Sequence, residues 1–290
     1  MAQLRQSSPL MRIFFLFALL PHSLLTTAQA IDVADWSTLE QQARGQTVYF
    51  NAWGGEPRIN SYLNWVAQTL EQRFDINLQH VKVADTGETV SRIVAERQAG
   101  NDTNGSIDLL WINGENFATL KENDLLFGPW AEQQPNFGLV NANRFPEMRE
   151  DFTVPTDGLE SPWTRSQLVF YHDSQWLVEP PRTIAAILDW STSNPGEFTY
   201  PRPPAFLGST FLKQAVLEIS NKDPALFAPV TDNEFQRVTS GLWDYLDALH
   251  PTLLRAGRHF PNSAAQLRRL MGDGDISLAL AFNPNEALLS

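Results

Sequence analysis

Apolar residues along the first half of the chain occur either in short runs or at helical spacing, and the two patterns alternate. Short apolar runs are typical of buried strands, whereas apolar residues that recur every three to four positions are typical of a helix with one buried face. The strands are expected at 47–52, 76–83 and 107–112, and the helices at 59–70, 90–97 and 117–125. Strands that each precede a helix predict a parallel α/β sheet with right-handed crossovers.

The second half of the chain repeats this alternation after an irregular stretch. Prolines interrupt residues 127–165, so we expect loops rather than regular structure there. Beyond it, strands are expected at 167–171 and 276–282, and helices at 183–190, from near Ser209, at 234–249 and at 263–271. We place a domain boundary near Trp163, which divides residues 31–163 from residues 164–290 as two α/β lobes.

Residues 1–30 have the order of a secretory signal peptide, in which charge precedes an apolar run and small residues follow it. Arg12 comes directly before the apolar run at 13–20, and residues 28–30 resemble a cleavage site. Met11 is an alternative start, because Arg12 would still supply the charge. The apolar run is shorter than the roughly 20 residues that span a bilayer, so we expect cleavage and a periplasmic mature protein.

The acidic balance of the chain limits the partners that it can bind. The formal net charge is −12, and removal of residues 1–30, which carry two arginines and no acid, makes it −14. Binding to nucleic acid or to anionic lipid needs a basic surface, so we expect neither. The chain has no cysteine, which fits an exported protein and excludes a thiol nucleophile and a lipid anchor at a cysteine.

The chain lacks the sequence motifs for metal, nucleotide or nucleophilic chemistry. Its histidines do not have HExxH spacing, and GxSxG, GxGxxG and GxxxxGK[ST] are all missing. A pair of facing carboxylates, as in a glycosidase, cannot be recognised among 33 acidic residues. We therefore expect no metal, no cofactor and no catalytic residue.

A tryptophan and two glycines stand where the first expected strand ends. In a parallel sheet, the loops at the carboxyl ends of the strands line the ligand crevice. Gly54 and Gly55 would let the backbone approach a solute, and Trp53 would offer an aromatic face beside it. Trp65 and Trp190 lie within helical apolar patterns, and we expect both in the core.

Two charged residues near other strand ends are further candidates. Glu115 follows the third expected strand, and Arg202 lies in a proline-rich loop where it could bind an anion. Aromatic walls with nearby acids suit an organic cation or a sugar ring.

Several stretches of the chain resemble one known family. They are VYFNAWGGEPRIN, IDLLWINGENFATLKENDLLFGPW, TYPRPPAFLGSTFLKQ and GDISLALAFNPNEA. From Val48 to Ala287, the chain resembles the periplasmic solute-binding component of a bacterial ABC importer. This family is related to the thiamine-, iron- and polyamine-binding proteins.

The resemblance implies a two-lobed, α/β type II periplasmic binding protein fold, in which a solute binds between lobes that close by a hinge. It also implies that the loaded protein docks on a membrane permease. The candidate ligand-binding residues that follow from it are Asn51, Trp53, Gly54, Gly55, Asn113, Glu115, Asn116, Trp163, Tyr200, Arg202 and Asn283.

The chain departs from the family after the FNPNEA stretch, where it reads only Leu288-Leu289-Ser290 whereas relatives continue. We therefore expect a truncated product in which the return segment that completes the first lobe is missing and the second lobe, residues 164–290, is incomplete. Strand edges left exposed in this way would favour aggregation.

These observations lead to one expected function and two alternatives. We expect an exported, non-enzymatic, monomeric receptor that delivers a small solute, such as a thiamine-like or other organic cation, to an ABC importer permease. The alternatives are an exported carbohydrate-active hydrolase with a tryptophan-lined groove and a periplasmic sensor or scaffold.

Overall fold

The computed structural model describes residues 32–33, 35–103 and 105–288. From Val33 onward, the described residues form one compact unit. The expected signal peptide, residues 1–30, lies outside the described residues. Within the described ranges, every helix is too short or too polar to cross a membrane.

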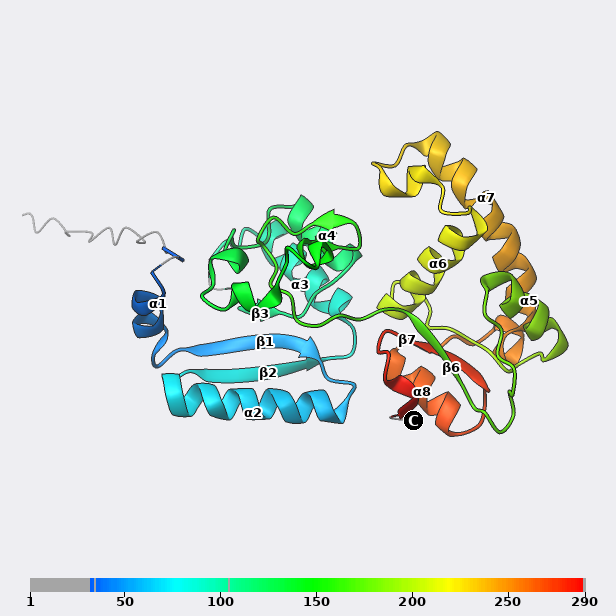
Figure 1. Cartoon of the computed structure of the whole chain (residues 1–290), viewed down its shortest axis with the longest axis horizontal. Helices are drawn as coiled ribbons and strands as arrows, with labels where there is room; N and C mark the ends of the chain where they lie inside the picture. Colours follow the sequence, from blue (N-terminus) through cyan, green and yellow to red (C-terminus); the bar gives the residue numbers. More distant parts are fainter. Residues whose placement is uncertain (1–31, 34, 104, 289–290) are drawn as a thin grey trace, which may run out of the picture. The chain divides into compact units, whose positions relative to one another are not determined.

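Helices and strands alternate along the chain, with short 3-10 helices in the connections (Figure 1). The strands are β1 (Thr47–Trp53), β2 (Asn77–Val83), β3 (Leu109–Leu110), β4 (Glu150–Asp151), β5 (Val154–Pro155), β6 (Val169–His172) and β7 (Leu278–Ala281). The α-helices are α1 (Trp36–Ala43), α2 (Pro57–Phe74), α3 (Thr86–Gln98), α4 (Glu115–Glu122), α5 (Ile184–Ser193), α6 (Phe206–Ile219), α7 (Asp232–Leu249) and α8 (Ala264–Gly272). The 3-10 helices are η1 (Ala131–Gln133), η2 (Phe137–Val140), η3 (Pro146–Arg149), η4 (Pro224–Phe227), η5 (His250–Thr252), η6 (Leu254–Gly257) and η7 (Glu286–Leu288).

The first sheet is parallel and has the strand order β2-β1-β3, which confirms the parallel α/β prediction for this half. β1 pairs with β2 along its whole length, whereas β3 pairs with β1 only at Leu109 and Leu110. Just before this pairing, the carboxylate of Asp108 accepts the backbone N–H of Tyr49 at 2.8 Å. A side chain thus takes the place of a backbone acceptor, and β3 is shorter than the expected 107–112.

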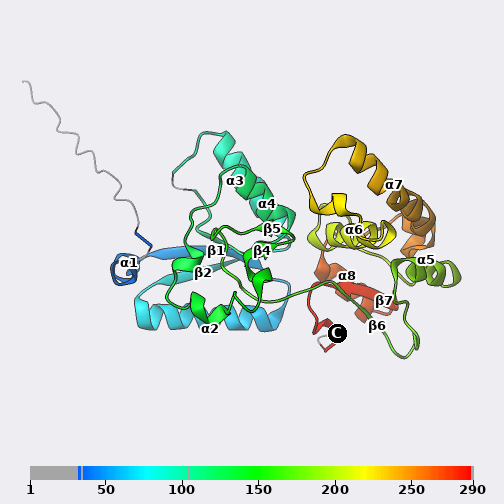
Figure 2. The ribbon, with the colours of Figure 1, turned by 45° about the horizontal axis from the view of Figure 1, so that its top comes forward.

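α2 packs on one face of this sheet (Figures 1 and 2). Pro57 stands at the first helical position, where its missing N–H costs nothing. The Glu56 carboxylate accepts the N–H groups of Arg58 at 3.0 Å and Ile59 at 2.7 Å, and so caps the helix. The buried residues of the small core beneath α2 are Phe50, Ala52, Leu63 and Leu78.

Trp65, which we expected in this core, is instead 58% exposed. It lies on α2 beside the stripe that faces the sheet, and its ring contacts Tyr62 at a centroid distance of 5.6 Å. The helical spacing of apolar residues did not show whether Trp65 lies at the centre of the buried stripe or at its exposed edge. Trp190 packs against the second core, as predicted.

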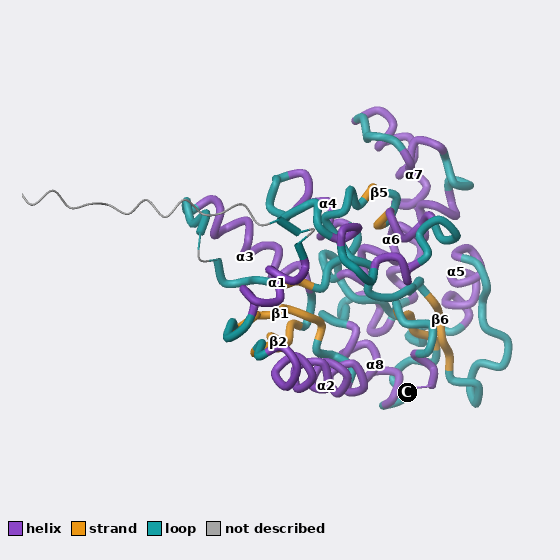
Figure 3. Tube along the Cα trace, turned by 60° about the vertical axis from the view of Figure 1, so that its left-hand side comes forward, coloured by secondary structure: helices purple, strands orange, loops and turns teal. Residues whose placement is uncertain are grey.

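Loops and short turns connect α4 to β6, as the prolines predict (Figures 2 and 3). Within this connection a tight hairpin joins β4 to β5, and Asp151 pairs with Val154 across it. The two residues at the tip, Phe152 and Thr153, have φ angles of 46° and 71°. Left-handed backbone is costly for a bulky residue and for a β-branched one, so this tip is strained.

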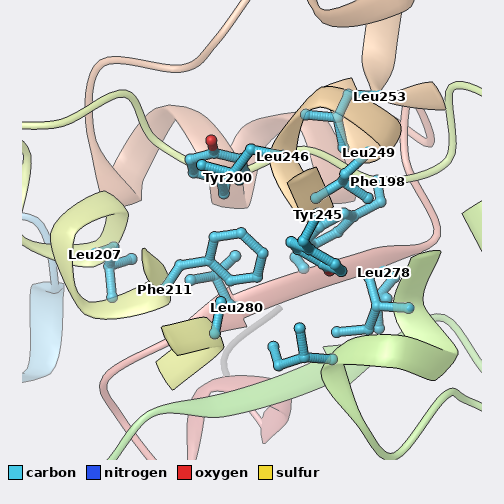
Figure 4. Close-up of a cluster of buried hydrophobic side chains, with 14 of the residues drawn as sticks. Phe198, Tyr200, Leu207, Phe211, Tyr245, Leu246, Leu249, Leu253, Leu278 and Leu280 are labelled. Atoms are coloured by element: carbon cyan, nitrogen blue, oxygen red, sulfur yellow. The ribbon is translucent and has the colours of Figure 1, made fainter. Parts of the chain in front are cut away.

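The second sheet pairs β6 with β7 and is antiparallel, and Phe198 adds a parallel bridge to Leu278. Helices α5, α6, α7 and α8 contribute buried side chains to the core on this sheet, part of which Figure 4 shows. Both expected strands are present in shortened form, at β6 and β7, and all four expected helices are present. Trp163 lies in the loop between β5 and β6, and a division into two lobes at that residue stays a prediction.

Candidate functional site

A cavity of about 990 Å³ lies where several strand ends and loops meet. Its wall comes from the ends of β1, β3 and β7, from the β4–β5 hairpin, from the loop before β6, and from α6 and α8. Strand-end loops are the expected location of a ligand site in an α/β protein. A smaller cavity of about 540 Å³ lies between β6, α5 and α6, and its described lining includes none of the predicted site residues.

Four predicted residues line the larger cavity: Trp53, Asn113, Trp163 and Asn283. Trp53 ends β1 and Asn113 follows the neighbouring β3, so both reach the cavity from the same edge of the first sheet. The side-chain amide of Asn283 donates to Oε2 of Glu286 at 3.4 Å. Their roles in ligand binding stay predictions, but the fold brings them to one place.

Gly54 and Gly55 do not line the cavity, and their small size serves the packing of the protein itself. A Cβ at Gly54 would lie 2.7 Å from Cβ of Lys82, and one at Gly55 would lie 2.6 Å from Cε2 of Trp53. Neither glycine has a left-handed φ. The backbone therefore comes close to the Trp53 indole and the Lys82 stem, and a close approach to a solute stays a prediction that this packing does not support.

Asn51 and Tyr200 lie inside the protein rather than at the cavity wall. Asn51 is 1% exposed in β1, two residues before the strand ends. Tyr200 is 3% exposed in the second core (Figure 4), and its hydroxyl lies 2.8 Å from Nε2 of His250. Burial raises the pKa of Tyr200 to about 12, so this phenol stays neutral. Position near a strand end did not predict the direction of either side chain.

The last three predicted residues have partners or surroundings away from the cavity wall. Glu115 forms an ion pair with Lys213 of α6. Asn116 is buried in the first turn of α4. Arg202 has an exposed side chain, and its backbone N–H donates to the carbonyl of Pro261 at 3.0 Å. A ligand contact by any of these three stays a prediction that their placement does not support.

The aromatic wall contains a tryptophan that sequence reasoning did not select. Trp111 directly follows β3 and lines the cavity with Trp53 and Trp163. The rings of Trp111 and Trp163 lie 5.4 Å apart between centroids and are tilted by 47°. Trp163 also contacts Phe50 edge-on at 6.4 Å, so the first core supports this wall. The expected strand at 107–112 placed Trp111 inside the strand, whereas β3 ends at Leu110 and leaves Trp111 at the strand end.

Two carboxylic acids in the wall were also missed, Asp151 and Glu160. Burial raises the pKa of Asp151 to about 6, although the N–H of Gly114 donates to its Oδ2 at 2.6 Å and favours the charged form. Burial, helped by the charge of Asp151, raises the pKa of Glu160 to about 8. Acids in a cavity whose pKa values are shifted toward neutral pH are typical of functional sites. Both lie in the irregular stretch 127–165, where no periodicity indicated which side chains face inward.

Asp85 and Arg268 join distant parts of the cavity wall. Asp85 caps α3 by accepting the N–H of Gly87 at 3.0 Å, and its second oxygen accepts the N–H of Phe206 at 2.8 Å. This contact fixes the start of α6 at Phe206, earlier than the expected Ser209. Arg268 of α8 donates to the carbonyl of Gly55 at 2.9 Å and also forms an ion pair with Glu286. Both contacts join the loops beside the first sheet to helices of the second half.

Among the described residues, no group of three or more histidine, aspartate or glutamate side chains is placed to hold a metal ion. The polar groups of the wall are instead carboxylates, amides and guanidiniums around aromatic rings. Such a wall can bind a small organic molecule by stacking, hydrogen bonds and charge.

Comparison with known proteins gives consistent results. Protein YnjB of Escherichia coli (strain K12) is 46% identical over 258 residues, which are 89% of this chain and 66% of YnjB. The chain therefore spans slightly less than two thirds of the length of that relative.

Two solved structures match most of the chain at low sequence identity, and the first of them is similar in fold. One, from a study of xylan utilization by the thermophilic bacterium Caldanaerobius polysaccharolyticus, has a TM-score of 0.54 and 14% identity over 81% of this chain and 61% of its own. The other, an ABC transporter from Rhodopseudomonas palustris CGA009, has a TM-score of 0.46 and 16% identity over 81% of this chain and 62% of its own.

The family described as bacterial extracellular solute-binding proteins matches residues 64–288, which is most of the chain. Proteins of this family bind solutes and are not enzymes, so the hydrolase alternative loses its support. The chain belongs to the bacterial extracellular solute-binding proteins and has their α/β, two-lobed type II periplasmic binding protein fold.

Proposed function

We propose that this protein is the solute-binding component of an ABC importer, which captures a small solute in the cavity described above and delivers it to a membrane permease. The observation that carries the proposal is the cavity itself, whose lining includes three tryptophans and the two acids of raised pKa, Asp151 and Glu160. Its volume of about 990 Å³ is at the upper end of the range usual for small-molecule sites.

The periplasm is the proposed location of the mature protein. The family is extracellular, residues 1–30 have the order of a signal peptide, and the chain has no cysteine. A periplasmic receptor meets its solute before the permease does, as import requires.

A solute panel with a matched pair of variants tests the proposal. Purified protein is titrated calorimetrically with organic cations, sugars, amino acids and metal complexes, and thermal unfolding is followed in parallel. We expect saturable one-to-one binding of one class and a higher melting temperature in its presence. Trp53→Ala should weaken that binding roughly tenfold while changing stability little, because an aromatic contact to the solute is lost.

Trp176→Ala is the control, since Trp176 is 80% exposed and outside the described cavity lining. Equal losses of binding and stability in Trp53→Ala would make Trp53 a structural residue. A folded protein that binds nothing in the panel would contradict the receptor function.

The sensor or scaffold alternative differs in its partner rather than in its cavity. Co-purification from a membrane extract separates the two, because a receptor of an importer should retain a permease and a sensor should retain a receptor kinase.

A further inference from the structure

Seven carboxylic acids and three arginines line the larger cavity, and most of their charges already have partners. The Glu56 carboxylate caps α2, and Asp85 caps both α3 and α6. Two further acids are in ion pairs within the lining, Glu147 with Arg165 and Glu286 with Arg268. The negative charges of these four acids are already compensated by helix N-termini or by arginines. We therefore expect them to attract a bound solute only weakly.

The remaining acids are Glu150, Asp151 and Glu160. Glu150 is exposed to solvent, whereas Asp151 and Glu160 are partly buried. Glu160 has no hydrogen-bond or ion-pair partner among the residues that the structure describes, and the charge of Asp151 helps burial to raise its pKa. Two partly buried acids whose charges act on each other leave a site of negative potential in the cavity lining.

Nearby positive groups do not fill this site. Lys213 attracts Asp151, but its ammonium is already paired with Glu115 and lies 5.2 Å from the ring centre of Phe152. Arg58, the remaining arginine of the lining, is exposed, so water and salt screen its charge.

We propose that the solute is an organic cation, whose positive group is held by the carboxyl groups of Asp151 and Glu160 and whose apolar part lies against Trp111 and Trp163. This inference rests on the proposed function and names the solute class of the same cavity. An ammonium near a tryptophan face is attracted by the ring as well as by the acids, and it is desolvated in the process. A bare metal ion fits less well, because it needs several oxygen ligands converging on one point.

The same pair of acids makes binding depend on pH. At neutral pH Asp151 is mostly ionised and Glu160 is mostly protonated, because burial and the charge of Asp151 raise the pKa of Glu160 to about 8. A cation that enters favours the ionised form of Glu160, whose proton leaves to solvent. Affinity should therefore rise with pH, by up to about tenfold per pH unit, until Glu160 is ionised in the free protein.

The test uses pairs of probes that match in shape and differ in charge. The whole chain is titrated calorimetrically at pH 6.0 and pH 8.5 with choline and its neutral isostere 3,3-dimethylbutan-1-ol. Spermidine, 1,8-diaminooctane with 1,8-octanediol, maltose and manganese chloride complete the panel. We expect a cation to bind, its neutral partner to bind at least tenfold more weakly, and the cation to bind more tightly at pH 8.5.

Two variants and one measurement on the wild type test whether Asp151 and Glu160 are the acids that bind the cation. Asp151→Asn and Glu160→Gln should each weaken the cation at least tenfold at pH 8.5, and Glu160→Gln should also remove most of the pH dependence. Glu71→Gln, on the exposed face of α2, should change nothing. Proton release by the wild type, obtained from binding heats in buffers of different ionisation enthalpy, does not depend on whether the variants fold.

The outcomes separate this inference from the proposed function. Binding of maltose or of a neutral isostere in preference to the cations leaves the receptor function standing and overturns the cation inference. Binding of manganese alone overturns it as well. A folded protein that binds no probe of any class contradicts both proposals.

Discussion

The backbone N–H of Phe206 donates a 2.8 Å hydrogen bond to Oδ2 of Asp85, a residue 121 positions earlier in the chain. The other oxygen of this carboxylate accepts the N–H of Gly87 at 3.0 Å. One negative charge therefore satisfies the N-termini of two helices, α3 and α6, whose dipoles both favour it. The contact joins the first sheet's helix layer to the second core.

Replacement of Asp85 by alanine should destabilise the protein more than loss of an ordinary helix cap. Two backbone N–H groups lose their acceptor, and each cap is worth about 1 kcal/mol, so we expect a loss of roughly 2 kcal/mol. Chemical denaturation with urea measures it. Asp85→Asn, which keeps one acceptor oxygen, should lose about half as much.

Asp244→Ala is the control for this prediction, because Asp244 is exposed within α7 and alanine suits a helix interior. If Asp85→Ala were no more destabilising than Asp244→Ala, the shared cap would contribute nothing measurable to the free energy of unfolding.

The hairpin tip at Phe152 and Thr153 offers a stabilising substitution. Thr153 is exposed and β-branched with φ at 71°, whereas glycine adopts this conformation without strain. We expect Thr153→Gly to raise the free energy of unfolding by roughly 1 kcal/mol. The same change in the exposed part of α5, Thr192→Gly, should lower it by a few tenths of a kcal/mol, about 0.3–0.5. A loss at both sites would show that the tip is unstrained.

The regular elements could be predicted from the sequence because their apolar residues repeat at the spacing of a strand or a helix. β1 and β2 begin and end within one residue of the predicted bounds, whereas α2 continues to Phe74, beyond the predicted end at 70. The cavity could be predicted only in part. Trp53 and Asn113 were found through their place at strand ends, whereas the same argument misplaced Asn51 and Tyr200, since it says nothing of side-chain direction.

Asp151 and Glu160 could not be predicted, because tertiary packing alone brings them to the wall. They lie in a proline-rich connection without periodicity, and their pKa values are raised by burial rather than by sequence neighbours. The family resemblance placed the fold but did not select these acids.

Glu160 should make the ligand-free protein less stable at high pH. Its pKa rises from 4.5 in an unfolded chain to about 8 in the fold, so the folded state binds more protons between these values. Its contribution is fully present below pH 4.5 and is lost as pH rises through 8. Glu160→Gln should therefore be more stable than the wild type at pH 9, by roughly 1–3 kcal/mol, and about equal at pH 5. Melting temperatures over this pH range measure the difference, and parallel curves for the two proteins would contradict it.

Arg268 should matter more for stability than a surface arginine in an ion pair. Its side chain is 19% exposed and that of its partner Glu286 is 5% exposed, whereas Arg97 and Asp102 are each 57% exposed. We expect Arg268→Met to cost roughly 2–4 kcal/mol, since it leaves a buried carboxylate without its cation and Gly55 without a donor. Arg97→Met should cost less than about 1 kcal/mol. Equal costs in urea denaturation would mean that the pair adds nothing beyond a surface contact.

Native mass spectrometry of the protein, exported by a bacterial host and purified without denaturant, tests most directly whether this cavity captures a solute. The account predicts a single small-molecule adduct in one-to-one ratio on the wild type, and its loss from Asp151→Asn. A folded wild-type protein that carries no adduct, and to which no organic cation, sugar or amino acid adds, would contradict the account.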